Sequence, residues 1–212
     1  MAGNFLWILD NGHGKATPGK RSPVLEDGRQ LLEYEFNRAI VRRLTAKLKA
    51  EAIQYHVSVP EIEGDISLAE RVRRANNLES ALPKLFVSIH GNAQSDNWGT
   101  ASGIETYYYE SSLKGRRMAA LFQEHLIETL QWKDRGIKTA NFYVIKNTDM
   151  PAILTENGFY SNRKECLKML SAKWREKIAE AHLLAIRDKP DCFFISFSKM
   201  WKKFCQKAFR IL

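Results

Sequence analysis

Cysteine is scarce in this 212-residue sequence, and an early apolar run is short. The three cysteines, Cys166, Cys192 and Cys205, form an odd set without CxxC spacing. They argue against a disulfide framework and against a thiolate zinc site. The apolar run at residues 5–9 has no basic segment before it, and Asp10 ends it too early for a signal peptide. We therefore expect a chain made in the cytoplasm without a signal peptide.

Acidic residues are missing from the end of the chain, so the net charge of +9 is unevenly spread. Residues 192–212 contain no acid and five basic residues, which leaves an ordinary +4 for the rest of the chain. The five are Lys199, Lys202, Lys203, Lys207 and Arg210. Because the excess charge lies in a tail without a recognisable binding motif, a nucleic-acid partner is not expected.

The tail at residues 189–212 also carries apolar side chains spaced three and four residues apart. They are Phe197, Met200, Trp201, Phe204, Ala208, Ile211 and Leu212. Lysines interrupt them too often for a membrane span, so the pattern predicts a basic amphipathic helix. Such a helix, rich in Phe and Trp, fits an anionic membrane surface, and docking on the rest of the chain is the alternative. We divide the chain into a catalytic domain at residues 1–188 and this tail.

The main part of the chain alternates between predicted strands and predicted helices. Strands are expected at residues 5–9, 53–59, 85–89, 104–109, 142–145 and 152–155. Helices are expected at about residues 32–52, 67–78, 113–130 and 162–187. This alternation predicts one α/β domain with an open, mostly parallel twisted sheet and helices on both faces.

Residue types that bind metals follow the buried strands of this predicted sheet. His13 follows the first strand, His90 comes directly after residues 85–89, and Glu156 comes directly after the last strand. The helix after the first loop contributes Glu33. Two imidazoles and a carboxylate make a catalytic zinc set, and a further carboxylate would be the general base. The HExxH motif is absent, so this is not an ordinary zincin.

The sequence resembles the zinc-dependent N-acetylmuramoyl-L-alanine amidases of the amidase-3 type. Six ordered blocks carry the resemblance: residues 8–14, 33–37, 87–93, 102–107, 135–144 and 151–162. It implies an open, phosphorylase/hydrolase-like α/β sheet. It also implies that His13, Glu33 and His90 bind one zinc ion and that Glu156 is the catalytic acid/base. The family spacing selects Glu33 over Glu35, because Glu35 would lie on a different face of the helix.

The resemblance also marks residues that could contact substrate. Asn92, Arg135 and Asn141 lie in family-like blocks, with ordinary loop hydrogen bonding as the alternative for each. Only about a dozen residues, 91–102, separate His90 from the next predicted strand. A long inhibitory helix is therefore not expected there, and the groove should be open.

The implied reaction is hydrolysis of the amide bond between the lactyl group of N-acetylmuramic acid and L-alanine in peptidoglycan. The enzyme would act on the cell wall after release or non-standard export. Two alternatives remain at this stage. One is a zinc carboxypeptidase-like peptidase, which would need a cationic clamp for a free carboxylate. The other is a catalytically inactive module that binds the wall.

Overall fold

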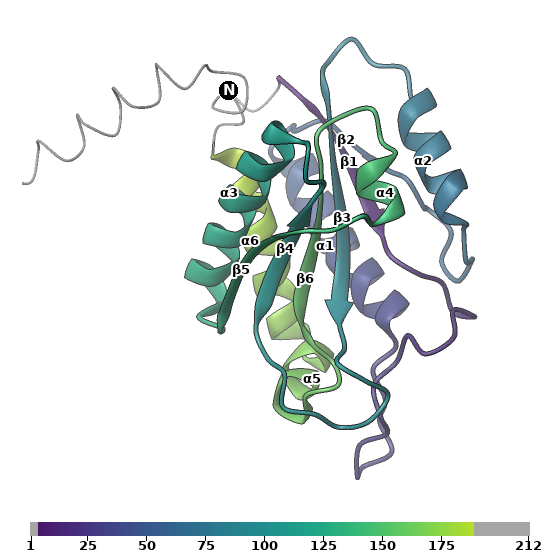
Figure 1. Cartoon of the computed structure of the whole chain (residues 1–212), viewed down its shortest axis with the longest axis vertical. Coiled ribbons are helices and arrows are strands. Elements are labelled where there is room, and N and C mark those ends of the chain that lie inside the picture. Colours follow the sequence, from purple (N-terminus) through teal and green to yellow (C-terminus); the bar gives the residue numbers. More distant parts are fainter. Residues whose placement is uncertain (1–3, 189–212) are drawn as a thin grey trace, which may run out of the picture.

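Six strands form one open sheet in the computed structural model, which describes residues 4–188 (Figure 1). Their order is β2-β1-β3-β6-β4-β5. The strands are β1 (Leu6–Asn11), β2 (Tyr55–Val57), β3 (Lys84–Asn92), β4 (Ile104–Tyr108), β5 (Asp134–Thr139) and β6 (Ala152–Phe159). The first four in spatial order are parallel to one another, whereas β4 runs antiparallel to β6 and β5 runs parallel to β4. The sheet is therefore mixed, and the predicted α/β class is confirmed.

Helices cover both faces of the sheet, as predicted (Figure 1). One face carries α1 (Glu33–Ala50), α3 (Leu113–Leu130) and α6 (Ala172–Arg187), together with the short α5 (Arg163–Leu170). The other face carries α2 (Leu68–Asn77) and α4 (Tyr143–Lys146). None of the helices within residues 4–188 is both long and apolar enough to cross a membrane.

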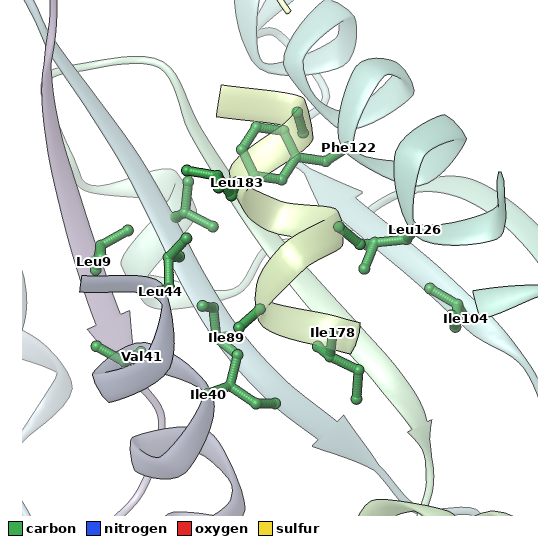
Figure 2. Close-up of a cluster of buried hydrophobic side chains, with 14 of the residues drawn as sticks. Leu9, Ile40, Val41, Leu44, Ile89, Ile104, Phe122, Leu126, Ile178 and Leu183 are labelled. Carbon is green, nitrogen blue, oxygen red and sulfur yellow. The ribbon is translucent and has the colours of Figure 1, made fainter. Parts of the chain in front are cut away.

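The larger hydrophobic core lies between the sheet and α1, α3 and α6 (Figure 2). Its fully buried side chains include Leu9, Ile40, Leu44, Ile89, Phe122, Leu126 and Ile178. A smaller core on the opposite face holds Ile8 and Phe86 against side chains of α2 and α4. Neighbours on a strand point to opposite faces, so Ile8 and Leu9 are both buried because β1 is covered on both sides.

The expected strand at residues 142–145 is wrong, because this segment forms the helical turn α4. The backbone N–H groups of Ile145 and Lys146 donate to the Phe142 carbonyl at 3.1 and 3.0 Å. Val144 and Ile145 are buried together in the smaller core, while Phe142 and Tyr143 remain exposed. A short apolar run cannot distinguish a strand from a turn of buried helix, and here packing against α2 accompanies the helix.

One strand was not predicted, and another is shorter than predicted. β5 is polar, contains Gly136 and lies at the edge of the sheet, so it lacks an alternating apolar pattern. The expected strand at 53–59 is reduced to β2, residues 55–57, at the other edge. The predicted tail helix lies outside the described residues and stays a prediction.

His182 is a buried histidine whose ring links α6 to β6. Its Nδ1 donates to the Ile178 carbonyl at 2.8 Å, and its Nε2 accepts from the Thr155 hydroxyl at 3.0 Å. The Thr155 hydroxyl in turn accepts from the Asn157 amide. Burial lowers the pKa of His182 to about 4, because charging the ring here would remove it from water. The ring is therefore neutral in the folded protein at neutral pH.

We predict that His182 makes the fold sensitive to mild acid. The unfolded histidine takes up a proton near pH 6.5 and the folded one near 4, so stability is lost as pH falls through this window. The predicted loss is about 3 kcal/mol. Urea unfolding gives the free energy of unfolding of the wild type and of His182→Gln at pH 7.5 and at pH 4. The wild-type value minus the His182→Gln value should fall by that amount between the two pH values. His125→Gln, at a partly exposed histidine of α3, is the control and should change by less than about 1 kcal/mol. A wild-type minus His182→Gln difference that does not vary with pH would contradict the assignment.

Candidate metal centre and its cavity

The three predicted metal ligands come together in space: His13 follows β1, and Glu33 begins α1. His90 lies within β3 and not after it as predicted, because the strand continues to Asn92. Glu33 Oε1 lies 3.3 Å from His13 Nε2 and 3.0 Å from His90 Nδ1. One ligand atom of each residue lies within 4.8 Å of those of the other two. Donors around a tetrahedral zinc ion with bonds of about 2.1 Å are separated by about 3.4 Å. The spacing and the donor types therefore fit one zinc ion.

Glu33 is buried at the first position of α1, where it has further hydrogen bonds. The backbone N–H of Gly91 donates to its Oε1 at 3.3 Å, and the Tyr160 hydroxyl donates to its Oε2 at 3.2 Å. Burial alone would raise the pKa of Glu33, but hydrogen bonds from His13 and His90 lower it far below its usual value. Glu35, in contrast, is exposed and accepts from the Tyr34 hydroxyl at 3.1 Å. Glu33 is thus the carboxylate that faces the histidines.

The backbone of His13 adopts an unusual left-handed conformation, with φ of 65°. Such a conformation costs energy for a residue with a side chain and persists only where surrounding contacts hold it. Two guanidinium groups supply those contacts, because Arg38 Nη1 and Arg71 Nη2 donate to the His13 carbonyl at 2.9 and 3.1 Å. They stabilise the backbone geometry that turns the His13 ring toward Glu33.

Gly12 leaves the space that the His90 ring occupies. A Cβ atom on Gly12 would lie 2.0 to 2.5 Å from three atoms of that ring, which is far inside contact distance. The Asn37 amide donates to the Gly12 carbonyl at 3.0 Å, so α1 also fixes this turn. Glycine is required here by the close approach of a ligand side chain.

Asp10, near the end of β1, is a buried carboxylate that is linked to both histidines through neighbouring side chains. It accepts hydrogen bonds from Arg71 Nη1 at 2.8 Å, Ser58 Oγ at 2.9 Å and Ser88 Oγ at 2.6 Å. Burial raises the pKa of Asp10, but the Arg71 charge and the Ser88 hydrogen bond outweigh it and lower the pKa overall. Asp10 is thus linked through Arg71 to the backbone carbonyl of His13, and through Ser88 to the ring of His90.

Ser88 connects Asp10 to the ring of His90. Its hydroxyl donates to Asp10, so its oxygen is available to accept from His90 Nε2, 3.1 Å away. Without a metal, Nδ1 can donate its proton to Glu33; with a metal at Nδ1, the ring proton would lie on Nε2, where the Ser88 oxygen can accept it. This hydrogen bond therefore favours the tautomer that a metal ligand needs.

Glu156 lies beside the three ligands, directly opposite His90 in the β3–β6 register. Its Oε2 is buried and makes no hydrogen bond within residues 4–188. Burial and the negative charge of Glu33 raise the pKa of Glu156 well above its usual value. A carboxyl group with a free oxygen and a raised pKa is suited to accept and return a proton.

These residues open into a cavity of about 670 Å³ between α2 and α4. Leu68, Phe142 and Tyr143 contribute exposed apolar surface to its wall, and Lys20 contributes a cation. The volume is within the usual range of ligand sites, roughly 300 to 1,000 Å³.

The residues predicted to contact substrate are placed differently from one another. Asn92 lines the cavity, and its amide donates to Glu105 at 2.7 Å. Arg135 does not line it, and its guanidinium donates to the same carboxylate at 2.6 Å. Asn141 is exposed and outside the cavity lining. A role in substrate binding stays a prediction for all three.

Several residues that support the site were not singled out from the sequence. Ser88 could have been found, because it lies two residues before His90 and side chains on a strand alternate faces. Arg38 and Arg71 gave no such signal, since their partners in the His13 turn are 25 and 58 residues away.

We predict that Gly12→Ala weakens metal binding by displacing the His90 ring. Zinc affinity, measured by competition with a chromophoric chelator, should fall about tenfold or more, as it does when a metal site's supporting residues are lost. Gly99→Ala is the control, because its added Cβ would meet only the end of the flexible Gln94 side chain. Equal zinc affinity in the wild type and Gly12→Ala would show that the His90 ring is not where metal binds.

Comparisons with known proteins agree with this geometry. Residues 8–188 match the Amidase_3 family model, described as N-acetylmuramoyl-L-alanine amidase. The chain is 37% identical over 177 residues to N-acetylmuramoyl-L-alanine amidase LytC of Bacillus subtilis (strain 168), covering 82% of this chain and 33% of LytC. It is 32% identical over 190 residues to the endolysin of Bacillus phage SPP1, covering 87% of this chain and 65% of the endolysin.

A solved structure shows the same architecture. The N-acetylmuramoyl-L-alanine amidase from Clostridium difficile 630 superposes with a TM-score of 0.75 and 32% identity, covering 86% of this chain and 94% of that one. The chain spans about a third of the length of LytC, so the match to LytC concerns one part of that larger protein. Together, the match over residues 8–188 and the shared fold show that the chain belongs to the Amidase_3 family of N-acetylmuramoyl-L-alanine amidases.

Proposed function

We propose that this chain hydrolyses the amide bond between N-acetylmuramic acid and L-alanine in peptidoglycan. One observation carries the proposal: the donor atoms of His13, Glu33 and His90 converge beside the free oxygen of Glu156, inside one cavity. Membership of the Amidase_3 family supplies the substrate class. The wall polymer lies outside the cytoplasm, so we propose that the enzyme acts there after release or export.

His13, Glu33 and His90 would hold one zinc ion in this site. The chemistry that zinc supplies in such a setting is Lewis acidity, which polarises a carbonyl and makes water reactive near neutral pH. Glu33 contributes the negative charge of the ligand set. Ser88 and Asp10 keep the His90 ring oriented, while Arg38 and Arg71 hold the His13 backbone.

Glu156 is the proposed acid/base. Its unpartnered Oε2 would accept a proton from the attacking water and return it to the departing nitrogen, which leaves poorly unless protonated. Burial and the charge of Glu33 raise its pKa, so its carboxylate is a stronger base than an ordinary one. Neither a nucleophilic serine nor a covalent acyl-enzyme is required.

The alternatives fit the described residues less well. A carboxypeptidase needs a cationic clamp for a free carboxyl terminus; Arg71 is already paired with Asp10 at 2.8 Å, which leaves Lys20 as a single lining cation for that role. An inactive wall-binding module has no need for a full ligand set or for a carboxyl group with a raised pKa. The family match favours the amidase over both.

We predict that Glu156→Gln abolishes turnover but retains zinc. The amide cannot take up the proton of water, so the turnover rate should fall at least about a hundredfold. Muropeptide release from purified cell walls measures activity, and atomic absorption measures bound zinc. Glu128→Gln, on the surface of α3, is the control and should leave both unchanged. An active Glu156→Gln enzyme would exclude Glu156 as the acid/base.

Chelation tests the metal requirement separately. Activity should disappear after dialysis against a chelator and return on addition of about one equivalent of zinc, because three protein donors and one open position define a catalytic zinc site. His13→Ala and His90→Ala should show neither zinc retention nor recovery. Full activity in the chelated, zinc-free protein would overturn the metalloamidase proposal.

A further inference from the structure

Lys20 is the cation of the cavity that the proposed mechanism does not use. Its backbone is fixed next to the metal centre, because its carbonyl accepts from the backbone N–H of Glu33 at 3.0 Å. The next residue, Arg21, pairs with Leu32 in an isolated antiparallel bridge. The loop therefore places Lys20 beside the start of α1, and its side chain lines the cavity.

Lys20 is a partly exposed residue, and its ammonium makes no hydrogen bond or ion pair within residues 4–188. The other permanently charged cation lining the cavity, Arg71, is paired with Asp10. Lys15, on the same loop, is paired with Glu63 at 3.0 Å. A cation on the wall of a cavity that has no ion-pair partner among the described residues is free to pair with an anionic ligand.

The charge of Lys20 shifts the pKa values of two groups of the site, Glu156 and His13. Burial and Glu33 raise the pKa of Glu156, and Lys20 acts in the opposite direction. Burial lowers the pKa of His13, and Lys20 adds to that effect. Lys20 nevertheless forms no ion pair with Glu156 among the described residues, so its ammonium is available to a ligand beside the reacting bond.

We infer that Lys20 binds a carboxylate of the substrate's stem peptide, close to the bond that is cut. The inference rests on the proposed function, which places a peptide in this cavity. The nearest carboxylate available in such a substrate is the α-carboxylate of the residue after L-alanine, which some walls carry as an amide. Lys20 would thus select stem peptides with a free carboxylate at the second residue over amidated ones.

The test compares two synthetic N-acetylmuramoyl-L-alanyl-D-glutamyl substrates whose γ-carboxyl is capped as an amide, one with a free α-carboxylate (the acid) and the other with an α-amide (the amide). For the wild type, KM should be about tenfold lower for the acid, since a charged hydrogen bond is lost with the amide. Lys20→Met should raise KM for the acid about tenfold and leave the amide's KM nearly unchanged. Because Lys20 also lowers the pKa of Glu156, any change in kcat should be the same for both substrates. Lys20→Arg should keep most of the preference, and the control Lys15→Met should keep all of it.

Two results would overturn the inference while leaving the amidase proposal intact. One is a wild-type enzyme that cleaves both substrates with equal KM. The other is a Lys20→Met enzyme whose KM rises equally for both substrates, which would show that Lys20 does not distinguish the carboxylate from the amide. Binding of the peptide product of the acid to zinc-loaded protein, measured by calorimetry, gives a readout without turnover. Its affinity should fall about tenfold in Lys20→Met, and an unchanged affinity would reject the inference even if neither substrate were cleaved.

Discussion

The buried ion pair between Asp10 and Arg71 joins the parts of the chain that make the candidate metal centre. Asp10 lies near the end of β1 and Arg71 lies in α2, and both side chains are almost fully buried. Isolating either charge would be very costly, so the two elements must dock with this pair formed. From it, Arg71 reaches the His13 carbonyl, and Asp10 reaches His90 through Ser88. Support of the fold and orientation of the ligands therefore depend on the same contact.

The site also carries local features that would be unfavourable elsewhere. His13 has a left-handed backbone, Gly12 packs against an imidazole ring, and one oxygen of Glu156 is buried without a hydrogen bond. Each lies within the cavity that opens between α2 and α4. Strain and unsatisfied polar atoms concentrated at one place, in an otherwise regular sheet, are typical of sites shaped for ligand binding and catalysis.

Local patterns predicted most of the fold, and they failed where tertiary packing decides between similar segments. The patterns were clear in β1 and β3, which are continuous apolar runs, and in α1, where apolar residues recur every four positions. Each of these elements packs against the core. Residues 142–145 are as apolar as a strand but form α4, which packs against α2. β5 is an edge strand with half-exposed side chains, so its sequence carries little periodic signal.

The sequence by itself determined that His13, His90 and Glu156 follow apolar strand segments and thus could share a site, although β3 and β6 extend past His90 and Glu156. Strand ends of a parallel sheet meet at one edge, which makes this inference local and general. Only the tertiary structure decided how those side chains are held. Asp10 and Arg71 are 61 residues apart, and no short-range pattern encodes their pairing. That the ammonium of Lys20 has no partner within residues 4–188 is likewise visible only once the partners of the neighbouring charges in that part of the chain are known.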